Sequence, residues 1–519
     1  MIPSFFLGAL LGAPWVLSFA PLSQWWLGLA LLAALSVLAV RVKSIKQAFV
    51  LGLGFGWSAY GVGVSWLFIS LHTHGGLPAG LAVLAVAAFA LYLAVFPALV
   101  VVAYRFVTCR FFQSNTVCKA LLWAALWSFS EWLRGTFLTG FSWLSLGDAL
   151  VDSPFSGLLA WLGSYGALGV LMVCGHMLLA LVLDVRQATV RHGLGVLLFT
   201  GAVVVLLMLP VHTRSAGGLP VAAVQPNVGQ SMKFDPDLIV SNMETIFSLG
   251  DLAQRLLPDG GLLLFPETVN PLVWADTPAA WRARFRDFAQ PDKSTVLMGS
   301  IIQDQDRYFN SIVQWHGHEQ GDALLVPQKR HDKHHLVPFG EFIPFGFGWF
   351  VSLLNMPMGE FTRGGGVEKP LTAGAQVFAS TVCYEDIFGG EFAQRLMQGP
   401  AEPTVLLNVS NLAWFGQSWA LDQHAQMGRT RSAEHRKPGL RVTNTGLSGL
   451  VDEFGQWQKK VNSDNAVVWT AQVDGRLGRT FFAQWGATVW FVMWGAVLVL
   501  LLARHGVYKA YNTRTQQKE

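Results

Sequence analysis

The first 211 residues consist largely of apolar stretches, each long enough to cross a lipid bilayer, for which an α-helix needs about 20 residues. Seven such stretches are expected at 4–20, 24–41, 47–71, 77–104, 118–134, 155–184 and 193–211, and an eighth at 485–503. Of all residues, 52% are hydrophobic and 13% are charged, against about 25% charged in soluble proteins. The sequence therefore predicts a multi-pass membrane protein with an eight-helix transmembrane bundle.

The composition changes at about residue 215. From there to about residue 479, charged residues are frequent and apolar runs shorten to strand length, which indicates a water-soluble α/β domain. Strands are expected near 220–225, 262–266, 296–301, 311–315, 378–382, 404–409 and 440–444, with helices near 240–255 and 279–289. The predicted domains are 1–214 with seven transmembrane helices, 215–479, and 480–519 with the eighth helix and a basic tail.

Basic residues in the short loops predict the orientation, because Lys and Arg gather on the cytoplasmic side. One side of the predicted bundle carries Arg41, Lys43, Lys46, Arg105, Arg110, Lys119, Arg186, Arg191, Arg504, Lys509, Arg514 and Lys518. The short loops of the other side carry only Arg134. Both termini are therefore expected in the cytoplasm and 215–479 outside it. The net charge of +4 lies mainly in membrane-flanking loops, so nucleic-acid binding has no support.

The stretch from Val377 to Val382 predicts a short buried strand that ends on Cys383. A strand end is a rigid mount for a reactive side chain, and the following loop gives access to it. Cys383 is the only cysteine of the predicted external domain, which excludes a disulfide within that domain. A lone thiol in an oxidising compartment is expected to be either buried and inert or used chemically.

Two further segments end on polar residues. The apolar run from Leu262 to Pro266 ends on Glu267, and Lys333 lies in a polar patch before Glu341. An ammonium favours a thiolate and stabilises an oxyanion, while a carboxylate can accept the thiol proton. Glu267, Lys333 and Cys383 together would suffice for acyl transfer through a thioester. Neighbouring strands of one sheet are expected to bring Glu267 and Cys383 together.

Several ordered motifs resemble those of the carbon–nitrogen hydrolase (nitrilase) superfamily. They are V-A-A-V-Q-P-N at 221–227, F-P-E at 265–267, K-H-H-L-V-P-F-G-E at 333–341, V-C-Y-E at 382–385, and L-N-V-S-N followed by A-W-F-G at 407–416. With spans on both sides, and E-W-L-R-G at 131–135 and T-G-F at 139–141, nearly the whole chain is similar to the apolipoprotein N-acyltransferase family.

The resemblance implies an α-β-β-α sandwich of two sheets and a role for particular residues. Glu267 would be the general base, Lys333 the oxyanion stabiliser and Cys383 the nucleophile, supported by Glu341, Tyr384 and Glu385. Residues expected to contact substrate are Phe234, Trp349, Phe350, Asn411 and Trp414. Phe234 stands where the family often has tryptophan and Leu412 where aspartate is usual. The resemblance implies no cofactor and no metal.

The implied reaction takes a fatty acyl chain from a glycerophospholipid, holds it on Cys383, and passes it to the N-terminal amine of a diacylglyceryl-cysteine apolipoprotein. The enzyme would be a monomer in the bacterial inner membrane, with its catalytic domain in the periplasm. The segment 342–357 is so apolar that we expect it to lie over the site and to touch lipid.

Several alternatives stay open at this point. A membrane-tethered amidase of the same superfamily would need only one anchoring span, and a transporter or scaffold would carry more ionisable residues within its spans. His331, His334 and His335 invite a metal site, but a surface or membrane-contact position is expected for them. Glu131 and Arg134 would either pair at i, i+3 or line a lipid cavity.

Overall fold

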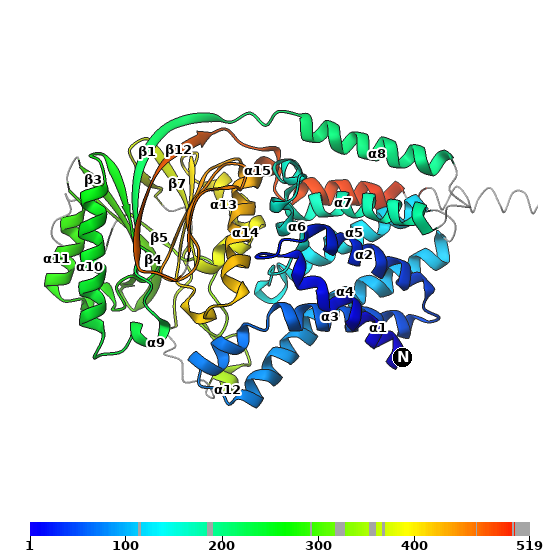
Figure 1. Ribbon diagram of the computed structural model, residues 1–519, viewed down its shortest axis with the longest axis horizontal. Coiled ribbons are helices and arrows are strands. Elements are labelled where there is room, and N and C mark those ends of the chain that lie inside the picture. The colour runs from blue at the N-terminus through cyan, green and yellow to red at the C-terminus, as the bar shows by residue number, and fades with distance from the viewer. Residues whose placement is uncertain are drawn as a thin grey trace, which may run out of the picture. The chain divides into compact units, whose positions relative to one another are not determined.

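The computed structural model describes residues 1–519 except 113–115, 184–189, 291–292, 317–326, 328, 352–359, 366–368, 463, 501–502 and 504–519. The basic tail and residues 352–357 of the 342–357 segment therefore lie outside the described residues, as does Arg186. The chain forms two compact units (Figure 1). The first comprises 1–65, 84–210 and 485–519, and the second comprises 66–83 and 211–484.

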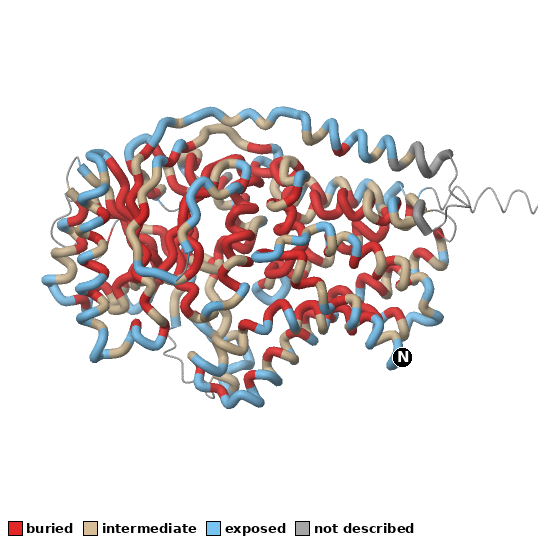
Figure 2. Tube along the Cα trace, in the orientation of Figure 1, coloured by how far each residue is buried: buried red, intermediate tan, exposed pale blue. Residues whose placement is uncertain are grey.

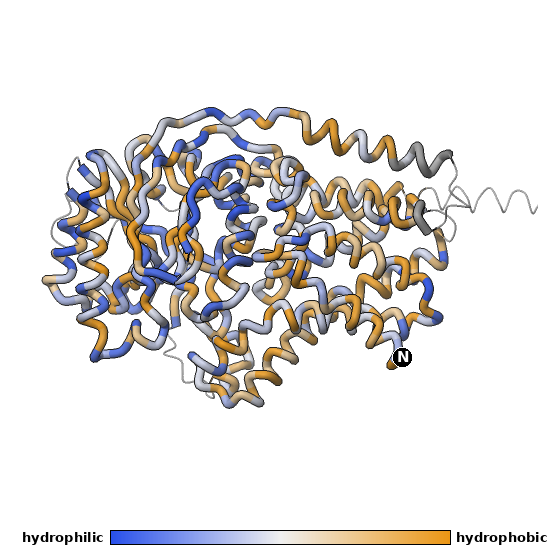
Figure 3. The backbone as a smooth tube through the Cα atoms, viewed as in Figure 1, coloured by the Kyte–Doolittle hydropathy of each residue, from blue (hydrophilic) through white to orange (hydrophobic). Residues whose placement is uncertain are grey.

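The first unit is helical and mostly apolar (Figure 3). Its main helices are α1 (Ile2–Gly12), α2 (Trp25–Arg41), α3 (Ile45–Gly63), α4 (Ala79–Phe111), α5 (Thr116–Arg134), α6 (Leu146–Ala149), α7 (Leu159–Leu183) and α8 (Val190–Met208). Among the described residues, Ala79–Phe111 and Ser156–Ala180 are long and apolar enough to span a membrane. Shorter apolar helices are Ile2–Ser18, Trp25–Arg41, Leu197–Met208 and Thr488–Leu500.

Small residues let helices α1 and α3 approach closely. A Cβ on Gly12 would lie 2.1 Å from the carbonyl oxygen of Phe55, and one on Gly54 would lie 2.2 Å from that of Phe5. Helices in a membrane pack in this way because apolar side chains are as well solvated by lipid as by another helix. Their association therefore depends on close van der Waals contact.

Glu131 and Arg134 form a buried ion pair within the first unit, with 2.5 Å between Arg134 Nη2 and Glu131 Oε2. Arg134 Nη1 also donates to the carbonyl oxygens of Phe141 and Trp143. Of the two alternatives that the sequence leaves open, the structure shows the i, i+3 pair.

The second unit contains two six-stranded sheets, in the orders β12-β1-β2-β3-β4-β5 and β11-β10-β9-β8-β7-β6. The strands are β1 (Arg214–Gln225), β2 (Gly261–Leu264), β3 (Ser294–Asp304), β4 (Arg307–Trp315), β5 (Arg330–Asp332), β6 (Leu371–Ala373), β7 (Gln376–Val382), β8 (Val405–Ser410), β9 (Gly439–Thr443), β10 (Ser448–Val451), β11 (Trp457–Val461) and β12 (Val467–Leu477). Each predicted strand coincides with one of these.

Alternation along the strands explains the layering. Val221 and Ala223 of β1 belong to the core between the sheets, whereas Ala222 and Val224 face a second core that includes residues of α10 (Ile239–Leu256) and α11 (Ala279–Phe288). On the other sheet, α13 (Gly389–Gln398) packs against β7 and β8. The residues of both cores are buried, and buried residues predominate in the strands of the two sheets (Figure 2). The α-β-β-α sandwich is confirmed.

The expectation that Glu267 and Cys383 follow neighbouring strands of one sheet is wrong. Glu267 follows β2 of the first sheet and Cys383 follows β7 of the second. Sequence runs show that two strands end on polar residues, but they do not show whether the strands pair or face each other. The candidate site is built across the sandwich from both sheets.

Candidate functional site

Cys383 stands at a strained turn directly after β7. Its φ of 52° is in the left-handed region, which costs a residue with a Cβ on the order of 1 kcal/mol. The turn is held through the carbonyl oxygen of Cys383, which accepts from Asn408 Nδ2 at 3.2 Å and from His424 Nε2 at 3.1 Å. These contacts fix the backbone from which the thiol projects.

The donor to that carbonyl is itself fixed by a buried chain of polar groups. Since a carbonyl oxygen only accepts, His424 carries its proton on Nε2, and Nδ1 accepts from Arg441 Nη2 at 2.7 Å. Arg441 also pairs with the carboxylate of Asp386. Burial, and after it the charge of Arg441, lower the pKa of His424 to about 4, so the ring is neutral at physiological pH.

Two carboxylates share one asparagine and one lysine beside this turn. Asn310 Nδ2 on β4 donates to Glu267 Oε1 at 2.7 Å and to Glu341 Oε1 at 2.9 Å. Lys333, directly after β5, lies 2.9 Å from the Glu341 carboxylate and 3.7 Å from that of Glu267. Lys333 is therefore paired more tightly with Glu341 than with Glu267.

Backbone contacts position the second oxygen of Glu267. Its Oε2 accepts from the backbone N–H of Asn411 at 2.7 Å. The loop behind Glu267 presses on β3, where a Cβ on Gly299 would lie 2.4 Å from the Glu267 Cα. Only glycine lets the two chains approach so closely.

The thiol is not a preformed thiolate. Burial raises the pKa of the Cys383 thiol and the carboxylate of Glu267 raises it further, while Lys333 opposes both effects. Burial alone would lower the pKa of Lys333, but Glu341 and then Glu267 hold it above its usual value. As expected, the nearby ammonium of Lys333 favours the thiolate, but its effect is smaller than the opposing effects of burial and Glu267, and the pKa of Cys383 stays raised. A thiol whose pKa is raised can act as a nucleophile only if a nearby base accepts its proton as it attacks.

Glu385 ties the cysteine turn to the lysine segment. Its Oε2 accepts from the backbone N–H of Val382 at 2.7 Å. Its Oε1 accepts from the backbone N–H of His334 at 2.7 Å and of His335 at 3.2 Å. The residue before Cys383 and the two residues after Lys333 are thereby held by one buried carboxylate.

The same carboxylate meets two cationic or polar side chains. Arg395 Nη1 lies 3.0 Å from Glu385 Oε1, and His331 Nε2 lies 3.1 Å from Glu385 Oε2. Burial alone would raise the pKa of Glu385, but Arg395 and His331 hold it below its usual range. The expected surface position of the histidines is wrong for His331 and His335, which are buried. Their acidic partners, Glu385 and Glu391, are distant in sequence, so composition around residue 331 could not show them.

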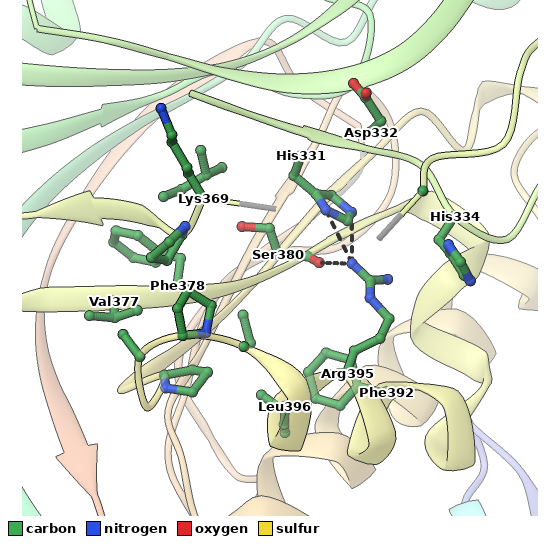
Figure 4. A pocket seen from close by; sticks show the side chains of 18 residues that line it. His331, Asp332, His334, Lys369, Val377, Phe378, Ser380, Phe392, Arg395 and Leu396 are labelled. Atoms are coloured by element: carbon green, nitrogen blue, oxygen red, sulfur yellow. Dashed lines mark hydrogen bonds between the residues drawn. The ribbon is translucent and has the colours of Figure 1, made fainter. Parts of the chain in front are cut away.

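A cavity of about 120 Å³ lies behind these partners (Figure 4). His331, Ser380 and Arg395 line it, and Arg395 contacts the His331 ring and the Ser380 carbonyl oxygen. Neither Glu267, Lys333 nor Cys383 lines this cavity, so it is separate from the cysteine turn.

The segment 66–83 contributes to the second unit beside the loop after β8. Ser70 Oγ donates to the carbonyl oxygen of Trp414 at 2.8 Å, and the ring of His74 lies 5.8 Å from that of Trp414. Trp66 and Phe415 form an edge-on ring pair at 4.5 Å. Asn411, at the start of this loop, contacts Glu267 through its backbone, and its side chain contacts Gln230 and Asn444.

The other predicted site residues differ in their surroundings. Tyr384 is half-buried and its ring lies 5.0 Å from that of Phe388. Phe350 packs with the cluster around Leu77, whereas Phe234 and Trp349 expose 43% and 65% of their surface. Leu412 is buried, so the position where aspartate is usual is apolar here.

Sequence reasoning missed Asn310, Asn408, His424 and Arg441. The available signal was an asparagine among the apolar residues of a predicted buried strand, which is clear at Asn408 and weaker at Asn310, because β4 also contains Ser311 and Gln314. His424 lies in a helix, α14 (Trp419–His435), and nothing in its neighbourhood distinguishes it from a surface histidine.

Comparison with known proteins agrees with this architecture. Residues 11–177 match the apolipoprotein N-acyltransferase N-terminal domain, and residues 220–480 match the carbon-nitrogen hydrolase family. The apolipoprotein N-acyltransferase of Ralstonia nicotianae is 36% identical, over 96% of this chain and 92% of that protein. Those of Bordetella bronchiseptica and Nitrosomonas europaea are 34% and 33% identical, over 95% and 94% of this chain and 95% of each relative. The chain therefore belongs to the apolipoprotein N-acyltransferase family.

Proposed function

We propose that this protein transfers a fatty acyl chain from a glycerophospholipid to the N-terminal amine of a diacylglyceryl-cysteine apolipoprotein, through a thioester on Cys383. The observation that carries the proposal is the arrangement beside Cys383, where Glu267 and Glu341 share Asn310 and Lys333. It supplies a base, a cation and a nucleophile in one buried place.

In the first half-reaction, the Cys383 sulfur attacks the ester carbonyl of the phospholipid while Glu267 accepts the thiol proton. The Lys333 ammonium stabilises the oxyanion. Collapse breaks the ester C–O bond, and the proton returns from Glu267 to the departing lysophospholipid alkoxide. The products are a Cys383 thioester and a lysophospholipid.

In the second half-reaction, the acceptor amine attacks the thioester carbonyl. Glu267 removes a proton from the amine, the new C–N bond forms and the C–S bond breaks. The proton then returns to the sulfur and restores the thiol. Water must be limited at this stage, because hydrolysis of the thioester would release a free fatty acid instead.

Tyr384 and Glu385 support the turn, and Glu341 keeps Lys333 charged and in place. Phe234, Trp349, Phe350, Asn411 and Trp414 are proposed to surround the substrates. Both substrates are lipid-anchored, which favours eight spans, cytoplasmic termini and a periplasmic catalytic domain in a monomeric inner-membrane enzyme. A reporter active only in the cytoplasm, inserted near Ser463, should be inactive; activity would contradict the orientation.

The reaction can be tested with purified protein in vesicles of phosphatidylethanolamine that carries a labelled acyl chain, together with a diacylglyceryl-cysteine peptide. We expect N-acylated peptide and lysophospholipid in equal amounts. Labelled free fatty acid without N-acylated peptide would instead favour a lipid hydrolase, and ammonia release from small amides would favour the tethered amidase.

A further inference from the structure

A second buried lysine lies beside Glu267. Lys233 ends the short helix α9 (Gln230–Lys233) and exposes 5% of its surface. Its Nζ donates to Thr268 Oγ1 at 2.5 Å and to the backbone carbonyl oxygen of Glu267 at 3.4 Å. The reaction described above gives this ammonium no part.

The charges of the cluster show why a second cation matters. Glu267 and Glu341 bring two carboxylates into a buried space, and Lys333 is 2.9 Å from Glu341 but 3.7 Å from Glu267. One negative charge is therefore left on the pair formed by Glu267 and Cys383. This charge stays on the pair whether the proton is on sulfur or on the carboxylate. Burying it without a counter-ion is costly.

The surroundings of Lys233 direct its charge to that pair. The small cavity next to it is lined by uncharged residues of several elements: Val228, Asn242, Met243, Ile246, Thr268 and Asn444. The charged or titratable groups that act on its ammonium are Glu267 and Cys383. Asp235, two residues further along the chain, accepts from the backbone N–H of Asp237. Burial lowers the pKa of Lys233 to about 8, against the attraction of Glu267 and Cys383, so Lys233 is charged at neutral pH.

We propose that Lys233 is a positioning residue that acts through Glu267 and Cys383, as the second counter-ion that holds this pair at one negative charge. The inference rests on the proposed roles of these two residues. Without Lys233, the pair binds an extra proton more readily. A protonated Glu267 can no longer accept the thiol proton, so thiol reactivity is lost at a higher pH than in the wild type.

The test follows the alkylation of Cys383 by iodoacetamide from about pH 5 to about pH 9, with the modified peptide quantified by mass spectrometry. This readout needs no lipid. In Lys233→Met we expect the acid limb of the rate profile to move up by about one pH unit, which is roughly a tenfold slower reaction on that limb. Above about pH 8 the wild-type and Lys233→Met rates should converge, because Lys233 then loses its own charge.

Two variants serve as controls. Lys233→Arg keeps the charge and should keep the wild-type limb, and Lys460→Met removes an exposed lysine and should change nothing. Thermal unfolding of each variant identifies any that fail to fold. A Lys233→Met profile that superimposes on the wild type, or that is lowered by one constant factor at every pH, would overturn the inference. If the wild type shows the expected limb but never acquires an acyl group from phospholipid, the proposed function fails while the role of Lys233 stands.

Discussion

Each unit of this protein buries a cluster of charged residues, and the two clusters differ in how completely their charges are paired. In the first unit, Arg134 meets one carboxylate, and its other terminal nitrogen donates to two carbonyl oxygens. In the second unit, Glu267 and Glu341 share one asparagine, while Lys333 is closer to Glu341. In the first cluster, one arginine neutralises one carboxylate, and neither group has a described partner with which it would exchange a proton. In the proposed mechanism, the second leaves Glu267 free to act as a base beside the Cys383 thiol, so we infer that buried charge serves stability in the first unit and catalysis in the second.

The largest effect is expected when the base is removed. Glu267→Gln keeps the shape and the hydrogen bonds to Asn310 and Asn411 in part, but it cannot accept the thiol proton. Acyl-enzyme formation, followed by rapid quench without acceptor, should slow by roughly 10²–10⁴-fold. An unchanged rate would show that another group takes the proton.

Removal of the cation should be almost as damaging. Lys333→Ala removes the ammonium that faces the developing oxyanion, and a loss of roughly 10²–10³-fold in kcat is expected. Lys333→Arg should rescue little, because a planar guanidinium does not fit the place of a compact ammonium between Glu341 and Glu267. Recovery to near wild-type kcat in Lys333→Arg would contradict this geometry.

Mutations of the fully paired cluster, Glu131 and Arg134, should change the stability of the protein and not its reactivity. Arg134→Ala leaves the Glu131 carboxylate buried and unpaired, which should destabilise the protein by about 3–5 kcal/mol. The double variant Arg134→Met with Glu131→Gln should recover part of this loss. Unfolding in detergent measures both variants. Alkylation of Cys383 in the protein that remains folded should proceed at the wild-type rate, and a slower rate there would mean that the two clusters are not separable.

The smallest effect is expected in the segment that follows Glu341. Phe345 and Trp349 are exposed, whereas Phe350 packs with the cluster around Leu77. If the exposed rings touch lipid, Phe345→Ser with Trp349→Ser should raise the apparent KM for phospholipid in vesicles roughly threefold to tenfold, with little change in kcat. Phe350→Ser is the contrast variant, because it should lower thermal stability. An unchanged KM in the double variant would contradict a contact between these two rings and lipid.

Local patterns were sufficient for much of this structure. The run from Val377 to Val382 predicts β7 and its polar end, and the two-sheet layering follows the family resemblance. The edge strand β5 has three residues, which is too short for an alternation of apolar and polar residues to be recognised, so it was not predicted. Asn310 could not be chosen over other asparagines, because its role depends on Glu267 and Glu341 converging across the fold. His331 was misjudged for the same reason, since its partner Glu385 follows a different strand.

In the proposed mechanism, Cys383 carries the acyl chain between the two half-reactions. Purified protein incubated with phospholipid in the absence of acceptor should gain the mass of one acyl chain, and peptide mapping should place it on Cys383. Cys383→Ala should gain none, and subsequent addition of a diacylglyceryl-cysteine peptide should remove the adduct from the wild type as N-acylated product appears. An adduct on another residue, or N-acylated product formed by Cys383→Ala at the wild-type rate, would contradict the account.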